Sequence, residues 1–491
     1  MTSENPTRRG ITLLGLGPGD PDLLTRQAWQ WITSIDEIVV RTRQHPTVEG
    51  FPPNLKVISF DEYYEQGERF EDVYARIVER VLELGRRAEG VTYAVPGHPF
   101  VAEATGPEIA RRAAAEGLPV RVIEGLSFLE PVFSALGVDP YPAMALVDGI
   151  ELGGLHVPPF PPNQPALIAQ IYSRQVASDV KLTLNALYPD EHPVRLVHAA
   201  GTARQVVEDL ALYEIDRSPH VGLMTALYVP PLAPDAALEA FQEIVAHLRA
   251  PDGCPWDKEQ TLTSLMPNLI EEAYEALDAL DEGNLVGVRE ELGDVLMVVM
   301  MLAQIASEEG EFNLVDVVQG IHRKIVYRHP HVFGEVQVDG TAGVLRNWEA
   351  LKEQERQAQG KSKTKGIFDG LPKVLPALNQ AQSYQERAAH VGFDWPNVDG
   401  VIEKVKEEWA ELESAVDEDE RQRELGDLLF ALVNLIRWHK ADAETLLRRA
   451  NQRFKQRFAY IEQAAREQNK KLSDMSLDEM ETLWQAAKKL E

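Results

Sequence analysis

The sequence is poor in cysteine, in long apolar runs and in basic residues. Its single cysteine, Cys254, excludes an internal disulfide and any cysteine-rich zinc or iron–sulfur site. The most apolar run, residues 295–303, is about half as long as a membrane-spanning helix requires. Only 49 Lys and Arg oppose 78 Asp and Glu, and the net charge is −29. This deficit of basic residues argues against nonspecific binding to nucleic acids or anionic membranes, so neither is expected as a stable partner.

A recognisable targeting signal is also missing from the sequence. Residues 1–10, MTSENPTRRG, have no apolar run after their two arginines, so we expect no secretory leader. Together with the lone cysteine, this predicts a cytoplasmic protein. The length of 491 residues is too great for one compact domain and predicts about three.

The first half of the chain alternates short β-rich runs with helical patterns, which is typical of α/β domains. A Pro-rich stretch at residues 156–165 interrupts the alternation, which then resumes. We therefore predict a two-lobe α/β domain over residues 9–232, with a hinge at the Pro-rich stretch and a cleft between the lobes. The predicted strands are 11–16, 37–40, 57–60, 91–95, 120–123, 166–171, 194–198 and 222–229, and the predicted helices are 71–87, 102–116, 177–187 and 203–212.

The second half is predicted to be all-α and contains an internal repeat. The motif EEAYE at 271–275 recurs as EEWAE at 407–411, and REELGDVL at 289–296 recurs as RELGDLL at 423–429. The polar segment QAQGKSKTK at 357–365 has the composition of a linker. We expect a first helical copy at 238–356, a linker at 357–370 and a second helical copy at 371–491.

Each copy is predicted to bring acidic side chains from two helices to one point. Glu272 and Glu275 are i,i+3 neighbours on one helical face, and Glu291 and Asp294 are i,i+3 neighbours on the next helix. Antiparallel pairing of the two helices would gather all four, and carboxylates that close repel one another unless a cation lies between them. The corresponding residues of the second copy are Glu408, Glu411, Glu424 and Asp427.

A donor set of carboxylate oxygens suits a hard cation, Mg²⁺ or Mn²⁺. A di-iron bundle would use Glu-x-x-His pairs, and neither copy has a histidine in that position. The alternative interpretation is a solvated acidic face of an amphipathic helix, but recurrence of the whole pattern within one chain favours a site.

These repeated motifs resemble the MazG-type nucleoside triphosphate pyrophosphohydrolases. The first copy also shows CPWD at 254–257, RHPHVFG at 328–334 and NWEALK at 347–352. The resemblance covers about residues 238–491. It implies an all-α, helix-bundle homodimer that uses Mg²⁺ to convert an NTP or dNTP to the nucleoside monophosphate and pyrophosphate, which would cleanse the nucleotide pool.

The resemblance also implies roles for individual residues. In the second copy, Glu408, Glu411, Glu424 and Asp427 match metal and catalytic positions; in the first copy the metal positions are Glu272, Glu275, Glu291 and Asp294. Phosphate-binding positions match Lys404, Arg453 and Arg457, and Trp484 matches a position near the nucleotide. Asn268 stands in the first copy where the second copy has Lys404. We therefore expect the second copy to be the more active one, with the first either active or a substrate-binding partner.

Three segments of the first half resemble the tetrapyrrole (corrin/porphyrin) methylases: GLGPGDPDLLT at 15–25, YAVPGHPFVAEAT at 93–105 and VIEGLSFLEPVFSALGVDP at 122–140. The resemblance implies that the cleft binds S-adenosylmethionine. The residues implied to contact it are Pro18, Gly97, His98, Ser127 and Phe128. Because His98 stands where family methyltransferases often carry an acid, a binding or dimerising lobe without methyl transfer is the alternative.

The order of a methylase-like domain and two MazG-like copies resembles the YabN-type fusion proteins. The leading hypothesis for the whole chain is therefore an Mg²⁺-dependent pyrophosphohydrolase. One alternative is a nucleotide-sensing regulatory protein without turnover, and another is an S-adenosylmethionine-dependent methyltransferase with appended helical domains. The apolar residues Val298, Val299, Met300 and Leu302 are expected to stay uncovered unless a second chain or the other copy covers them.

Overall fold

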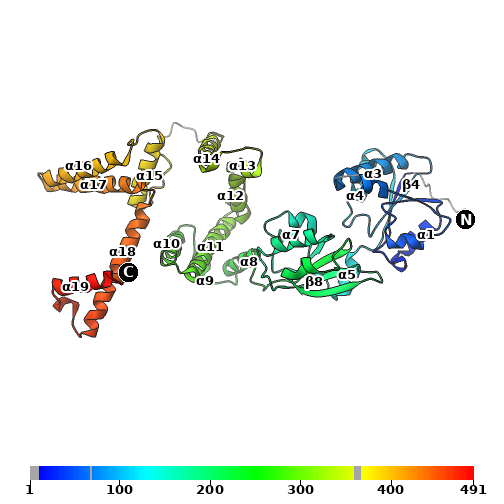
Figure 1. Ribbon diagram of the computed structural model, residues 1–491, viewed down its shortest axis with the longest axis horizontal. Helices are drawn as coiled ribbons and strands as arrows, with labels where there is room; N and C mark the ends of the chain where they lie inside the picture. The colour runs from blue at the N-terminus through cyan, green and yellow to red at the C-terminus, as the bar shows by residue number, and fades with distance from the viewer. Residues whose placement is uncertain (1–9, 67–68, 359–365, 491) are drawn as a thin grey trace. The chain divides into compact units, whose positions relative to one another are not determined.

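The computed structural model describes residues 10–66, 69–358 and 366–490. The chain forms two compact units, residues 1–258 and residues 259–491 (Figure 1). Helix α8 (Leu238–Arg249) belongs to the first unit, so this division falls later than the predicted start of the first copy at residue 238. Within the predicted linker, residues 359–365 lie outside the described residues, as does the N-terminal segment 1–9.

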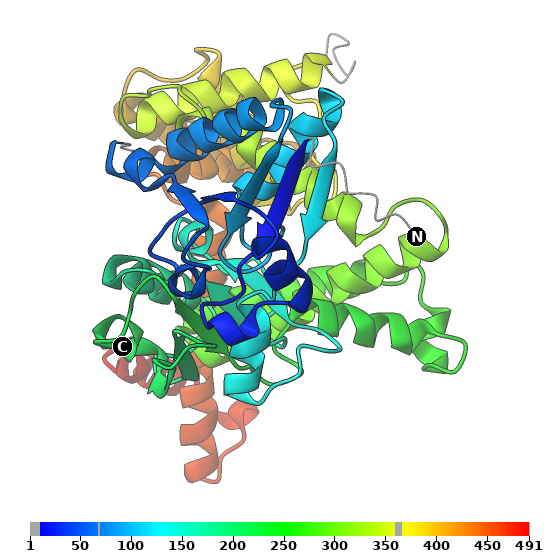
Figure 2. The same cartoon turned by 90° about the vertical axis from the view of Figure 1, so that its right-hand side faces the viewer.

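The first lobe is built on a five-stranded parallel sheet in the order β3-β2-β4-β1-β5. Every residue of β1 and β4 is buried, because helices cover both faces of the sheet. Helices α3 (Phe70–Gly85) and α4 (Thr105–Ala115) pack on one face and α1 (Arg26–Ile32) on the other (Figure 2). The strands are β1 Ile11–Gly15, β2 Glu37–Val40, β3 Lys56–Ser59, β4 Val91–Val95 and β5 Val120–Ile123.

The second lobe is built on a mixed sheet in the order β6-β7-β10-β8-β9. Only the β6–β7 pair is parallel; the other pairs in this sheet are antiparallel. Helix α7 (Arg174–Leu184) packs on one face and α5 (Leu129–Leu136) on the other. The strands are β6 Ala145–Asp148, β7 Ala166–Ala169, β8 Pro193–His198, β9 Val206–Ala211 and β10 Thr225–Val229.

Two predictions about this domain are wrong. The chain leaves the first sheet after β5 and enters the second at β6, so the Pro-rich stretch at 156–165 lies inside the second lobe rather than at a hinge between lobes. The predicted helix at 203–212 contains instead the strand β9, in which Val207 pairs with Val197 of β8. Pairing with a neighbouring strand outweighs the weak local helical preference of this segment.

A buried ion pair ties the first sheet to its covering helices. Arg41, directly after β2, donates to the carboxylate of Glu103, whose side chain is 2% exposed. Arg41 also donates to the hydroxyls of Tyr64, at 2.8 Å, and Tyr74, at 3.0 Å. Glu103 in turn accepts from the backbone N–H of Thr105 at 2.9 Å, at the start of α4. Each partner of the pair is therefore hydrogen-bonded, as a buried charge requires.

His45 should make the stability of the first unit depend on pH. Burial lowers the pKa of its imidazole to about 4, and its Nδ1 has no hydrogen-bond partner among the described residues. The unfolded chain, with a histidine pKa near 6.5, takes up a proton before the folded chain does. The free energy of unfolding should therefore fall by up to about 3 kcal/mol as the pH is lowered from about 6.5 to about 4.

Urea denaturation across this pH range measures the effect. The H45N variant should lose most of the pH dependence that His45 contributes, whereas H156N, at an exposed histidine, should keep the wild-type dependence. An H45N variant with the wild-type pH dependence would contradict this account of His45.

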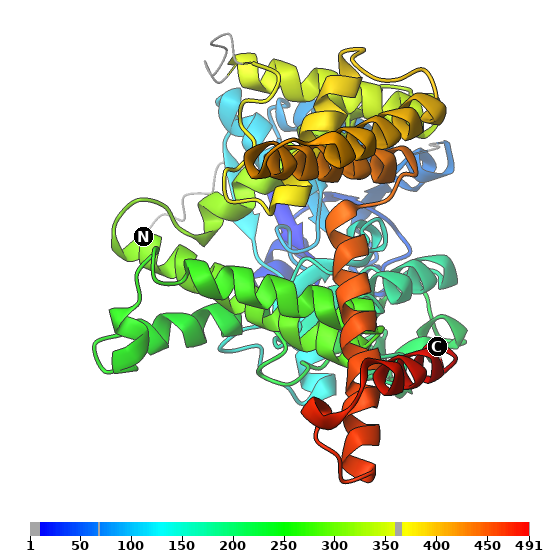
Figure 3. The same cartoon turned by 90° about the vertical axis from the view of Figure 1, so that its left-hand side faces the viewer.

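Among its described residues, the second unit consists of helices and the loops that join them, without strands. In each copy two long helices form an antiparallel hairpin, α10 with α11 and α16 with α17 (Figure 3). Local signals set the turns: Gly283 ends α10 at φ +69°, and Asp417 caps α17 by accepting from the Glu420 N–H at 2.8 Å. The helices after α8 are α9 Pro255–Glu259, α10 Met266–Glu282, α11 Leu285–Glu308, α12 Leu314–Arg328, α13 Pro330–Phe333, α14 Gly340–Ala358, α15 Ala377–His390, α16 Val398–Ser414, α17 Glu418–Trp438, α18 Ala443–Glu467 and α19 Leu477–Lys488.

The apolar face that stays uncovered differs from the predicted one. Val298 and Met300 are 2% and 3% exposed, and Val299 and Leu302 are half-buried, so the single chain already covers them. The exposed apolar side chains lie along the whole of α10 and on the first half of α11. They include Leu269, Ile270, Tyr274, Leu277, Leu292, Leu296 and Met297, each at least 36% exposed.

Candidate functional site

In the second copy, the hairpin of α16 and α17 brings three carboxylates together. Glu408 projects from α16, and Glu424 and Asp427 project from one face of α17. One carboxylate oxygen from each lies within 4.8 Å of the others. Glu408 is only 5% exposed, although it is ionisable, so its charge needs a nearby countercharge.

The fourth predicted residue, Glu411, lies close to this group without being one of the three nearest. The pKa of Glu424 is raised, first by burial and then by the charges of Glu411, Asp427 and Glu408. A carboxyl group whose neighbours all carry the same charge is stabilised by a bound cation.

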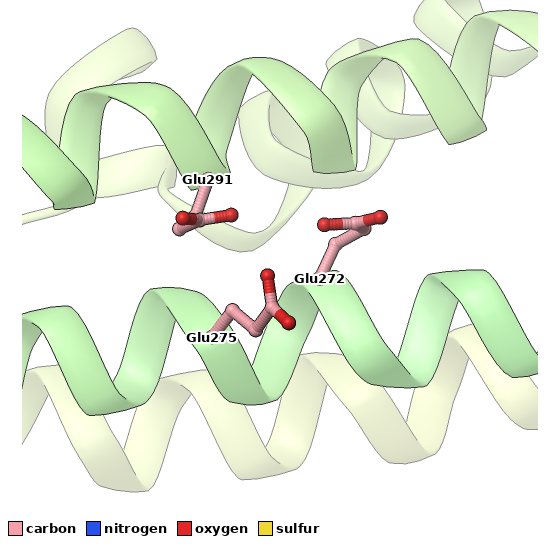
Figure 4. A group of neighbouring side chains, drawn as sticks. All are labelled: Glu272, Glu275 and Glu291. Atoms are coloured by element: carbon pink, nitrogen blue, oxygen red, sulfur yellow. The ribbon is translucent and has the colours of Figure 1, made fainter.

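The first copy repeats the arrangement with a different nearest trio. Glu272 and Glu275 of α10 and Glu291 of α11 direct their carboxylates toward one another across the hairpin (Figure 4), with oxygens within 4.8 Å. Burial and then Asp294 and Glu275 raise the pKa of Glu272. Burial and then Glu275 and Asp294 raise the pKa of Glu291. Asp294 is therefore beside the trio, as Glu411 is in the second copy.

Both trios fit a hard divalent cation. All six donors are carboxylate oxygens, the ligands that Mg²⁺ and Mn²⁺ prefer, and no histidine or cysteine belongs to either group. Burial, and then the charges of neighbouring carboxylates, raises the pKa of Glu272, Glu291 and Glu424, and a bound cation would offset both effects.

Lys404 pairs with two carboxylates of α16, one of which belongs to the trio. Its Nζ lies 2.6 Å from Glu408 Oε1 and 2.9 Å from Glu407 Oε1. Hydrogen bonds to Glu408 and Glu407 raise the pKa of Lys404 above its usual range. The one-turn spacing of Lys404 and Glu408 in the sequence was the signal for this contact.

The structure brings Arg457 and Trp484 together. The guanidinium of Arg457, on α18, lies 5.3 Å from the centre of the Trp484 ring on α19, and the Phe454 ring lies 5.2 Å from it. A cation beside an aromatic ring can contact the phosphates and the base of one nucleotide. Arg453 makes no ion pair with Glu408, Glu424 or Asp427 among the described residues, so the structure does not join these two sets of predicted residues.

An equivalent Arg–Trp pair in the first copy was missed by the sequence analysis. The Arg328 guanidinium lies 5.5 Å from the Trp348 ring centre and also binds Glu355 at 2.6 Å. The available signal was the spacing Trp-x-x-x-Lys, which occurs as Trp348 with Lys352 and again as Trp484 with Lys488.

In the first unit, glycine turns meet at the carboxyl ends of β1, β4 and β5. A Cβ atom on Gly15 would lie 2.5 Å from the Gly125 nitrogen and 2.6 Å from the Gly97 oxygen, so close backbone packing requires glycine there. Gly97 differs: at φ +68° its added Cβ would meet only Ser127 Cα, at 3.9 Å, and Leu126 O, at 4.0 Å. The carboxyl edge of a parallel sheet with room beside a glycine is a usual place for a ligand.

The other predicted cofactor residues lie around this edge with varied contacts. Pro18 faces the second lobe, because a Cβ on Gly201 would come within 2.9 Å of Pro18 Cγ. His98 accepts from the Phe100 N–H through Nδ1 at 3.1 Å. The buried Ser127 donates to Glu130 at 2.6 Å, and Phe128 packs in the core beneath α5. The sequence analysis missed the loop at 199–205, whose signal was Gly201 between two strands.

Comparison with known proteins agrees with this architecture. Residues 10–216 match the family of Tetrapyrrole (Corrin/Porphyrin) Methylases, and residues 260–333 match the MazG nucleotide pyrophosphohydrolase domain. The uncharacterized protein YabN of Bacillus subtilis (strain 168) is 42% identical over 490 residues, which cover 98% of this chain and 99% of YabN. The chain belongs to the YabN family. The predicted fusion of a methylase-like α/β domain with a MazG-type helical region is thereby confirmed.

Two relatives match the helical half and its flanks. The nucleoside triphosphate pyrophosphohydrolase/pyrophosphatase MazG of Thermotoga maritima is 43% identical over 251 residues, which cover 50% of this chain and 95% of that protein. The nucleoside triphosphate pyrophosphohydrolase of Escherichia coli (strain K12) is 40% identical over 260 residues, which cover 52% and 98%. A solved cobalt precorrin-4 methyltransferase, 14% identical, covers 47% of this chain and 98% of its own with a TM-score of 0.35. None of the described helices is long and apolar enough to span a bilayer.

Proposed function

We propose that the helical unit hydrolyses nucleoside triphosphates, NTP or dNTP, to the monophosphate and pyrophosphate with Mg²⁺ or Mn²⁺, and so removes unwanted nucleotides. The observation that carries the proposal is the convergence of Glu408, Glu424 and Asp427 within 4.8 Å, in a chain that has relatives named for this reaction.

The proposed role of each residue follows from its charge. Glu408, Glu424 and Asp427 hold the cation, and Arg453, Arg457 and Lys404 bind the negative triphosphate. Trp484, beside Arg457, contacts the nucleotide. Glu411 lies next to the trio rather than in it, which leaves its carboxylate able to accept a proton from the attacking water. The cation, when bound, supplies Lewis-acid polarisation of the phosphate oxygens.

Pyrophosphate release from a panel of NTPs and dNTPs tests the proposal. With Mg²⁺, at least one nucleotide should yield stoichiometric pyrophosphate and monophosphate, and removal of divalent cations with EDTA should abolish the release. Absence of release from every nucleotide would overturn the enzyme proposal in favour of the nucleotide-sensing alternative. Release of inorganic phosphate and a nucleoside diphosphate would show cleavage between the β- and γ-phosphates and would contradict the proposed reaction.

We further propose that the chain acts as a homodimer, in the cytoplasm and without a stable nucleic-acid partner. The exposed apolar side chains of α10 and α11, among them Ile270 and Leu292, support an interface, because burying such a face is favourable. Light scattering of the purified chain should give twice its mass of 54.9 kDa. An I270D/L292D variant should shift the mass toward one chain.

For the first unit we propose binding of S-adenosylmethionine at the carboxyl edge of its parallel sheet. The open side of Gly97 supports this, since a ligand can approach the backbone there. Methyl transfer is a separate question, because His98 replaces the acid that family methyltransferases often carry. Calorimetry with S-adenosylmethionine tests the binding. A G97V variant should abolish it, because valine would occupy the open side and is strained at φ +68°.

A further inference from the structure

Lys404 places a positive charge inside the second-copy carboxylate site. Its ammonium lies 2.6 Å from Glu408, one of the three predicted metal ligands, and that glutamate's side chain is 7% exposed. A buried carboxylate is costly without a countercharge, and here the chain itself supplies one. A cation that binds Glu408 is therefore repelled by an ammonium already paired with that carboxylate.

The first-copy site has the same type of donors without this ammonium. Asn268 occupies the position one turn before Glu272, and an amide side chain carries no charge. Across the described residues, no ion pair reaches Glu272, Glu275 or Glu291. The influences that raise the pKa of Glu272 are burial and the charges of neighbouring carboxylates. The two copies therefore present similar ligands to a metal and differ in one competing charge.

We propose that Lys404 weakens the binding of free divalent cations at the second-copy site until a triphosphate draws its ammonium away, whereas the first-copy site binds a cation more tightly without nucleotide. The inference rests on the proposed function, in which both trios hold a metal. The Lys404 side chain is 39% exposed and has a flexible four-carbon stem, so it can move from Glu408 to a phosphate. Cation and nucleotide then strengthen each other's binding, and more so in the second copy than in the first.

Binding of Mn²⁺ to the full chain in the absence of nucleotide tests the difference between the copies. Free Mn²⁺ can be counted by electron paramagnetic resonance. The wild type should show one tighter class of site, lost in E291Q, and one class about tenfold weaker, lost in E424Q. A difference of about tenfold is the order expected for unit charges about 4 Å apart that are screened mainly by water, as they are here because the Lys404 side chain is 39% exposed.

Reciprocal substitutions provide the decisive comparison. K404N should tighten the second-copy class about tenfold, and N268K should weaken the first-copy class about tenfold. K404R keeps the charge and should keep the wild-type isotherm. Opposite shifts at two different sites cannot arise from one folding defect, and thermal unfolding of each variant checks the fold. Should K404N not fold, N268K and the effect of a nucleotide analogue on Mn²⁺ binding by the wild type decide the question.

The analogue α,β-methylene-ATP cannot be cleaved between its α- and β-phosphates. Its addition tests whether Lys404 leaves Glu408 when a triphosphate binds. The analogue should raise the Mn²⁺ affinity of the second-copy class in the wild type by about tenfold more than it does in K404N. If K404N binds Mn²⁺ no more tightly than the wild type does, the inference is overturned. It is also overturned if the wild type binds no Mn²⁺ at all. Failure of the proposed function is distinguishable, because it appears as absent pyrophosphate release in an assay that this isotherm does not use.

Discussion

Replacement of Glu424 by glutamine should lower the rate of NTP hydrolysis by at least about hundredfold without unfolding the protein. A metal ligand contributes several kcal/mol to stabilising the charge that develops on phosphate oxygens, and each 1.4 kcal/mol is about tenfold in rate. Glutamine keeps the shape of the side chain but removes its charge. Pyrophosphate release under saturating Mg²⁺ measures the loss.

Thermal unfolding of the same variant separates a chemical defect from a structural one. Because burial and then the charges of Glu411, Asp427 and Glu408 raise the pKa of Glu424, removing its charge should leave the melting temperature unchanged or higher. E403Q is a matched control, since Glu403 lies on α16, is 71% exposed and pairs only with Lys406 in the salt bridges described. An E424Q variant as active as E403Q would remove Glu424 from the site.

Replacement of Glu103 by alanine should destabilise the first unit by about 3–5 kcal/mol. The substitution leaves Arg41 buried without its carboxylate, and an uncompensated buried charge carries a penalty of this size. It also removes the acceptor for the Thr105 N–H at the start of α4. Chemical denaturation followed by a probe in the first unit measures the change.

E108A provides the control for this experiment. Glu108 lies on α4, just after Glu103 in the chain, and pairs with Arg111 at the surface, where solvent screens an ion pair and its contribution to stability is small. Pyrophosphate release should survive E103A below the melting transition, because Glu103 belongs to the other unit. A loss of stability no greater than that of E108A would contradict the role assigned to the buried pair.

The sequence predicted best those elements that are buried on both sides. Strands β2 and β4 begin and end at the predicted residues, because parallel strands between two helical layers are largely apolar runs. The edge strand β5 also has the predicted bounds, although two of its four residues are exposed. The failure at 203–212 concerns an edge strand. Val207 in β9 is 37% exposed, and its conformation depends on pairing with Val197, which no local pattern reveals.

For the carboxylate site, the i,i+3 spacing predicted which residues share a helical face. It did not predict which of the four carboxylates lie closest together. The i,i+3 pattern correctly placed Glu424 beside Asp427 and across from Glu408. Which three of four carboxylates come closest differs between the copies, because that choice depends on side-chain rotamers and helix separation. The pattern also failed to identify the open face: α11 is apolar on more than one side, so sequence could not tell that Met300 would be covered and Leu292 exposed.

The carboxylates of the two copies have the same chemistry but different surroundings. Each copy contains a hairpin of acidic residues and an Arg–Trp pair, in which the guanidinium lies 5.5 Å from the ring centre in the first copy and 5.3 Å in the second. The difference lies at Asn268 and Lys404, whose ammonium lies 2.6 Å from Glu408. In the proposal made above, this one unit of charge gives two otherwise similar sites different affinities for a metal.

The most direct test of the central claim is to locate Mn²⁺ by anomalous diffraction in crystals grown with α,β-methylene-ATP. The account predicts an anomalous peak between Glu408, Glu424 and Asp427 of the hairpin, with the triphosphate in contact with it. Crystals that hold the nucleotide while Mn²⁺ is absent from that position, or bound only elsewhere, would contradict it.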